Sequence, residues 1–143
     1  MEQLHIPPSG IPRVSKQITI NHMLTVPDHK PEVDCIIDAT VDIHIIKAVV
    51  IDTPVHINCH PVRKVIVIGK AQIIVKYVAK VINQQVHAAV FHIPFEALIK
   101  WPGGPPAGTE ICVGVTVEHF QIDPLDYRDL MKVLLIRLDV YHK

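Results

Sequence analysis

Apolar and polar residues alternate most regularly in the middle of the chain, across residues 65–99. From Lys70 to Val81 apolar side chains occupy every second position, and lysine or glutamine fills most positions between them. A period of two predicts a β-strand with one buried and one solvated face. The polar turn Asn83-Gln84-Gln85 separates this strand from a second apolar run, Val86 to Ile93, which Pro94 ends. The two runs predict an antiparallel hairpin.

Alternation of the same kind predicts further strands on both sides of this hairpin. They cover Lys16–Val26, Asp34–Ile46, Glu110–Phe120 and Leu134–Val140. His22 falls on the apolar face of the first strand, where a mostly buried histidine is expected. Residues 48–51 either continue the second strand or begin its partner, and Asp52-Thr53-Pro54 breaks it. Residues 95–99 form either a short strand or a helical turn.

The composition favours sheets over helices. Ile and Val together number 41 against 8 Leu, and β-branched side chains pack well on a pleated surface. We therefore expect an all-β fold, a two-sheet antiparallel β-sandwich of about seven or eight strands. A chain of 143 residues suits a single domain.

The first 15 residues differ from the rest of the chain. They include three prolines and little periodicity, which predicts an extended arm ahead of one domain at residues 16–143. Three apolar side chains, Leu4, Ile6 and Ile11, give the arm little reason to remain solvated. We expect the arm to dock on a neighbouring subunit by adding a strand to an open sheet edge.

Charge and targeting features exclude several classes of protein. Fourteen basic and fourteen acidic residues are interspersed, so no basic stripe is available to neutralise phosphates, and nucleic acid is not an expected partner. The first residues lack a secretion signal, and no apolar run approaches the roughly 18 residues of a membrane span. We expect a protein made in a cytosol, with no membrane partner.

Few residues form candidate chemical sites. Asp34, Asp38 and Asp42 share one face of a predicted strand but span roughly 27 Å, so they predict a solvated face and not a metal site. The segment His56–Pro61 contains three weak candidates for metal ligands, His56, Cys59 and His60. A closed zinc site normally needs four ligands in recognisable pairs, and no second pair is present. An irregular loop or strand edge is the alternative, and we expect no cofactor and no enzymatic activity.

The three cysteines, Cys35, Cys59 and Cys112, cannot all pair within one chain because their number is odd. Buried reduced thiols are one interpretation. The other is an intermolecular disulfide, for which Cys59 is the candidate because its surroundings are the most polar. Trp101, the only tryptophan, opens a loop rich in proline and glycine. It either caps the sandwich or contributes to an interface between subunits.

A series of short motifs resembles the SPOCS domain family, which is found in the SipL morphogenetic protein and in other spore coat and exosporium proteins of spore-forming Firmicutes. In chain order the motifs are Pro27-x-x-Lys30-Pro31-x-Val33-x-x-Ile36, Gly69-Lys70, Tyr77-Val78-Ala79, Val86-His87, Ile93-Pro94-Phe95 and Asp126-x-Arg128. The resemblance covers residues 16–143. Two features depart from the family: no LysM-like module is present in these residues, and the segment His56–Lys64 is longer than the usual turn.

The resemblance implies a structural or assembly role and supplies no catalytic residue. It implies synthesis in the mother-cell cytoplasm followed by residence at the spore surface, in the coat or exosporium. From the resemblance and the composition we expect a structural protein that self-associates into a layer or fibre. The alternative is a non-catalytic binding module that recruits another coat protein.

Overall fold

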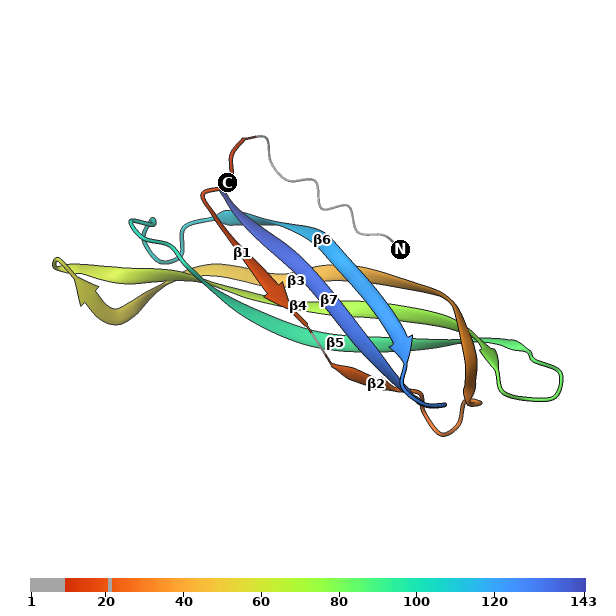
Figure 1. The fold of residues 1–143 in the computed structure, drawn as a ribbon. Coiled ribbons are helices and arrows are strands. Elements are labelled where there is room, and N and C mark those ends of the chain that lie inside the picture. Colours follow the sequence, from red (N-terminus) through yellow and green to blue (C-terminus); the bar gives the residue numbers. More distant parts are fainter. Residues whose placement is uncertain (1–9, 21) are drawn as a thin grey trace.

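All regular secondary structure in the described residues is β-strand. Figure 1 shows the computed structural model, which describes residues 10–20 and 22–143. The strands are β1 (Val14–Thr19), β2 (Met23–Thr25), β3 (Val33–Ile57), β4 (His60–Ala79), β5 (Val86–Lys100), β6 (Ile111–Pro124) and β7 (Asp129–His142). The predicted all-β class is confirmed. The described residues include no helix with the length and apolar character needed to cross a membrane.

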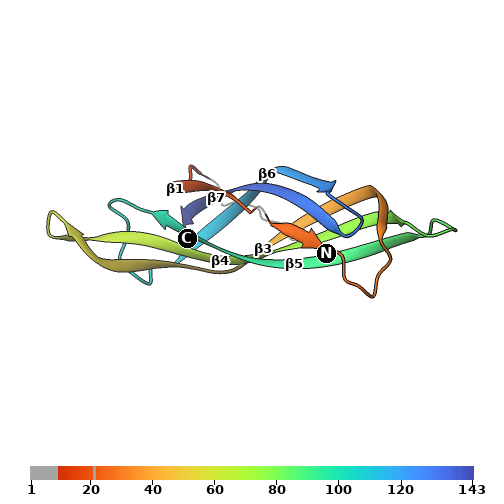
Figure 2. The same ribbon diagram turned by 60° about the horizontal axis from the view of Figure 1, so that its bottom comes forward.

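The strands form two antiparallel sheets that pack face to face (Figure 2). Sheet B has the order β3-β4-β5. In sheet A, β7 is central, with β6 along one side and β1 and β2 one after the other along the opposite side. Aliphatic side chains of both sheets share one core. The predicted two-sheet sandwich is therefore confirmed, and sheet B extends beyond sheet A at both ends (Figure 1).

β4 and β5 form the predicted antiparallel hairpin, and β4 is the central strand of sheet B. The inward positions Ala71, Ile73, Val75, Tyr77 and Ala79 are fully buried. The Tyr77 hydroxyl donates a hydrogen bond of 2.8 Å to the carbonyl oxygen of Pro31. Burial raises the pKa of this phenol, and the positive charge of Arg128 partly offsets the rise.

Pro94 does not end β5, contrary to the prediction from the sequence. The pairing with β4 continues through Lys70 and Pro94 as far as Lys64 and Lys100. β5 is an edge strand of sheet B, so a residue without an amide hydrogen can lie in it with its nitrogen facing away from the ladder. Residues 95–99 are therefore strand and not a helical turn.

β3 also continues where a break was predicted, at Asp52-Thr53-Pro54. Asp52 pairs with Arg63 and His56 pairs with Pro61, so three residues of β3 face the single residue Val62. The Thr53 hydroxyl donates a hydrogen bond of 2.7 Å to the Val62 carbonyl oxygen, which connects β3 to β4 within this irregular stretch. The proline is accommodated because β3 is the other edge strand and its ladder is already interrupted there.

The first predicted strand is divided into two. β1 pairs with the end of β7 and β2 with its beginning, and the Ile20 amide donates to the Leu134 carbonyl oxygen between them at 2.8 Å. β1 begins at Val14, slightly before the predicted domain boundary. His22 lies in the gap and is exposed, so its predicted burial is wrong. Ile20 and Leu24, on either side of the gap, are buried as predicted, so His22 alone departs from the alternation.

Residues of the short motifs contact one another although they are far apart in the sequence. The Arg128 guanidinium donates to the carbonyl oxygens of Pro27 and Lys30, at 2.9 and 3.0 Å. The Asp126 carboxylate accepts the amide hydrogens of Arg128 and Asp129, at 2.8 and 2.7 Å, and these bonds lower its pKa. The motif Asp126-x-Arg128 thus joins the turn before β7 to the turn before β3.

Lys132 lies in the core, although lysine is rarely buried without a partner. Its side chain is 1% exposed, and none of the described residues accepts a hydrogen bond from its Nζ atom. Burial lowers its pKa from 10.5 to about 8. Lys132 continues the inward series of Leu134, Ile136 and Leu138 toward the start of β7. It therefore occupies a position that would ordinarily hold an aliphatic residue.

Candidate functional site

The hairpin of β3 and β4 projects past the last paired residues of β5. Lys64 pairs with Lys100, where β5 ends, so the hairpin beyond Lys64 is two-stranded. Asn58 and Cys59 form its turn, and both have positive φ angles, +52° and +64°. Two consecutive residues of this kind form a type I′ turn, whose twist matches that of paired strands. Of the two alternatives for this segment, an irregular loop or a strand edge, the structure shows the second: His56 and Ile57 end the edge strand β3, and the chain turns directly into β4.

The tip does not bring the weak metal-ligand candidates together. Ile57 pairs with His60 and His56 pairs with Pro61, so the two histidines lie on opposite faces of the ribbon. The histidines are separated in this way because the chain reverses direction at Asn58 and Cys59. No group of three or more His, Cys, Asp or Glu side chains in the described residues has the arrangement of a metal site.

The cysteines are more accessible than buried thiols would be. Cys35 and Cys59 are exposed and Cys112 is half-buried. The register between β3 and β4 shifts near the start of β3, so Cys35 pairs with Val78 and not with Tyr77, whose side chain faces the core. The shift explains why Cys35 is exposed despite its place in an apolar series. Cys59 remains the candidate for an intermolecular disulfide, because its thiol lies at an exposed hairpin tip.

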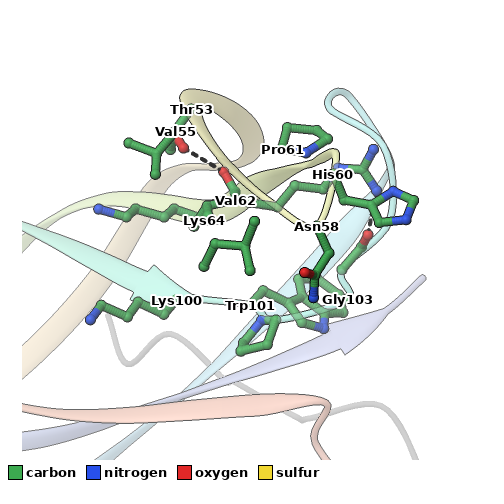
Figure 3. Close-up of a pocket in the computed structure, with 14 residues that line it drawn as sticks. Thr53, Val55, Asn58, His60, Pro61, Val62, Lys64, Lys100, Trp101 and Gly103 are labelled. Carbon is green, nitrogen blue, oxygen red and sulfur yellow. Dashed lines mark hydrogen bonds between the residues drawn. The ribbon is translucent and has the colours of Figure 1, made fainter.

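A hollow of about 800 Å³ lies beneath the projecting hairpin (Figure 3). One side is formed by the hairpin, including Val55, Ile57 and Val62, and the other by the loop that follows β5. Val55 and Ile57 are well exposed although they are aliphatic. Lys64 and Lys100 lie at its edge. The hollow is therefore apolar inside with a positively charged rim.

The loop after β5 is shaped by a turn with Trp101 at its start. The Gly104 amide donates to the Trp101 carbonyl oxygen at 3.0 Å, and Gly103 has a φ of +67°. Pro102 followed by a glycine with positive φ is the pattern of a type II turn. A Cβ atom on Gly104 would lie 2.8 Å from the Trp101 ring. Both glycines are therefore needed for the indole to fold back over its own turn.

Trp101 is only 6% exposed, and its ring packs edge-on against His142 with centroids 5.4 Å apart. It belongs to the core cluster, the location expected of a residue that caps the sandwich. Little of its surface remains for a neighbouring subunit. Of the residues predicted for assembly in the arm, Ile11 is highly exposed, whereas Leu4 and Ile6 lie outside the described residues.

Arg63 connects the loop that begins at Trp101 to the β3–β4 hairpin by hydrogen bonds. Its Nε atom donates to Asp52 at 2.9 Å and its Nη1 atom to the Gly104 carbonyl oxygen at 2.5 Å. The main-chain oxygen of Arg63 also accepts the Trp101 amide at 3.0 Å. One residue thus joins β3, β4 and the wall of the hollow.

Arg63→Met should weaken this wall, because it removes both guanidinium bonds while leaving the backbone pairing intact. We expect stability to fall by about 1 kcal/mol and amide hydrogen exchange at Trp101 and Gly104 to accelerate. Arg137→Met is the matched control, since Arg137 also pairs with an aspartate, Asp139 at 2.9 Å, but within β7 of sheet A. Equal effects of the two substitutions on Trp101 exchange would contradict this role.

The positive rim has no compensating carboxylate among the described residues. Lys64 and Lys100 lie directly opposite each other across the β4–β5 ladder, and like charges so placed are unfavourable. Lys16 of β1 adjoins them and donates to the Leu98 carbonyl oxygen at 2.7 Å. The rim therefore favours an anionic partner, which the alternation in the sequence could not reveal because three separate strands supply the lysines.

Comparison with known proteins identifies one family. A family model described as SipL, SPOCS domain, matches residues 32–125, about two thirds of the chain. Neither the curated proteins nor the solved structures give a match.

Proposed function

Because the chain belongs to the SPOCS domain family, we propose that it is a structural spore-surface protein that associates with copies of itself into a layer or fibre. The family supports a spore-associated role. The proposal is non-catalytic and requires no cofactor. Other spore coat proteins are further expected partners. Synthesis in the mother-cell cytoplasm would precede incorporation into the coat or exosporium.

The observation that carries self-association is a set of exposed aliphatic side chains on the outer face of sheet B. Sheet A covers only the inner face. On the outer face, Ile68, Val90 and Leu98 are exposed between polar positions such as Lys70 and Lys76. Ile68 and Leu98 lie diagonally opposite each other across the β4–β5 ladder, and exposed aliphatic side chains that lie together are typical of protein–protein contacts.

The open edges of the sheets provide a second means of association. β3 and β5 are the edge strands of sheet B, and β6 is an edge of sheet A. Exposed strand edges can pair with a strand from another chain. Pro94 interrupts the donor row of β5 and would limit uncontrolled pairing there.

Sedimentation velocity on the purified chain, over about a hundredfold range of concentration, tests the proposal. Self-association predicts species that grow in mass as the concentration rises. A single monomeric species throughout would overturn it and favour the alternative, a module that recruits a different coat protein.

Deleting residues 1–12 should abolish or strongly weaken assembly while the domain stays folded. The cut preserves Arg13, whose amide donates to the Val140 carbonyl oxygen, and all of β1. The physical reason is that strand addition to an open edge depends on the arm. A chain with Ile11→Ala alone is the control for loss of one apolar side chain. If the truncated chain assembles as the full chain does, the arm has no part in assembly.

A further inference from the structure

The connection between β4 and β5 projects from the end of the molecule opposite the hollow (Figure 1). Its aliphatic residues are unusually accessible: Ile82 is fully exposed, and Val81 and Val86 are also exposed. Val81 was expected on the buried face, but β4 already ends at Ala79. We call residues 80–86 the apical tip.

The apical tip carries apolar residues where polar ones are the rule. Tight connections are usually rich in glycine, proline, asparagine and serine. Ile82 contributes nothing to the core of its own chain, so the fold gives no reason for an aliphatic side chain there. Such a residue is typical of a contact with another surface.

We propose that the apical tip of one copy docks in the hollow under the β3–β4 hairpin of the next copy. The inference rests on the proposed self-association and adds its geometry. Because the two surfaces differ and lie at opposite ends, the contact is head-to-tail, and repeating it gives an open chain of subunits and not a closed dimer.

The hollow suits this occupant in size and lining. A volume of about 800 Å³ is within the range of pockets that enclose drug-sized ligands, so it has room for two aliphatic side chains. Val55, Ile57 and Val62 supply apolar wall. Docking would cover Val55 and Ile57 together with Ile82, which are all exposed in the single chain.

The charges of the two ends are complementary. Lys64 and Lys100 border the hollow and lack a carboxylate partner among the described residues. Glu32 and Asp34 flank the apical tip: the Glu32 carbonyl oxygen accepts the Lys80 amide at 2.8 Å, and Asp34 accepts a bond from Gln84 at 3.4 Å. The cation at the tip, Lys80, already lies over the ring of Tyr127 at 3.2 Å from its centroid. Docking would therefore bring two carboxylates toward two lysines, which fixes the orientation of the contact.

A pair of substitutions tests the contact. Ile82→Asp should raise the concentration needed for assembly by at least about tenfold, because it places a charge in an apolar hollow. Met23→Asp is the matched control: Met23 is also an exposed apolar residue, but it lies on β2 of sheet A, outside the surfaces proposed for assembly. Circular dichroism should show both variants folded, since neither side chain is in the core.

Disulfide trapping gives an independent readout. In a background with Cys35→Ser, Cys59→Ser and Cys112→Ser, chains carrying Val55→Cys are mixed with chains carrying Ile82→Cys under mild oxidation. We expect a crosslinked dimer that contains one chain of each kind. Dimers that form equally within either population alone would overturn the head-to-tail contact.

The outcomes separate this contact from self-association itself. If the unaltered chain assembles and Ile82→Asp assembles at the same concentration, the contact is wrong and the proposed function stands. If the unaltered chain remains monomeric, both are overturned. Loss of assembly in Ile82→Asp with retention in Met23→Asp supports the contact.

Discussion

Replacing Lys132 with methionine should raise the free energy of unfolding by about 3 kcal/mol at neutral pH. Burial lowers the pKa of Lys132 from 10.5 to about 8, and each pKa unit corresponds to about 1.4 kcal/mol. A buried ammonium group without a partner is costly, whereas methionine has a similar length and no charge. Urea denaturation of both chains measures the difference. Lys76→Met is the control, since Lys76 is exposed on the outer face of β4, and its effect should stay within about 0.5 kcal/mol.

The pH dependence of this difference has a defined sign. Between pH 8 and pH 10.5 the unfolded chain keeps the proton on Lys132 while the folded chain loses it. The unfolding free energy contributed by Lys132 therefore rises with pH across this window, and below it the penalty is complete and constant. The advantage of Lys132→Met should be greatest at or below pH 8 and shrink toward pH 10.5. An advantage that is absent, or that does not change with pH, would contradict the buried and unpaired state of Lys132.

Gly69→Ala should lower the free energy of unfolding by about 2–3 kcal/mol, the cost of forcing an extra atom into a filled core. A Cβ atom at Gly69 would lie 2.5 Å from the ring of Phe95 and 2.8 Å from the main-chain oxygen of His44. Phe95 pairs with Gly69 across the ladder, so its ring covers the space that a side chain would occupy. Thermal and urea denaturation check the prediction.

A double variant separates the clash with the ring from the clash with the backbone. Phe95→Leu removes the nearest atoms, so Gly69→Ala should cost less in that background than in the unaltered chain. The contact with His44 remains, and some loss should persist. If Gly69→Ala proves as stable as the unaltered chain, the ring does not constrain this position.

The sequence predicts the central strands well because apolar and polar residues alternate over many positions and only one face of each sheet packs on the core. Ala71, Ile73, Val75 and Tyr77 lie on the predicted face and are fully buried. The all-β class and the two sheets follow from the same physical cause, the packing of β-branched residues on pleated surfaces. The short motifs are explained by contacts within the fold, such as those of Arg128 with the turn before β3.

Strand boundaries at prolines were predicted less well. Pro54 and Pro94 were expected to end strands, but both lie in edge strands, where the missing amide hydrogen need not break the pairing. Edge position depends on the order of strands in the sheet, which the local pattern does not contain. The irregular pairing that exposes Cys35 is likewise invisible to a strict alternation of odd and even positions.

The candidate site depends on long-range arrangement even more strongly. The hollow joins the β3–β4 hairpin to the Trp101 loop through Arg63, and these segments are separated in the sequence by about forty residues. Lys132 could have been found by extending the apolar series of Leu134, Ile136 and Leu138 two residues toward the N-terminus. The exposed position of Ile82 could also have been suspected from the sequence, since an isoleucine beside a polar turn is unusual.

Negative-stain images of the purified full chain at concentrations where sedimentation detects association test the central proposal most directly. We expect filaments or layers with a regular subunit repeat, and their disappearance in Ile82→Asp but not in Met23→Asp. Images that show only dispersed single particles of the unaltered chain would contradict self-assembly as the function of this protein.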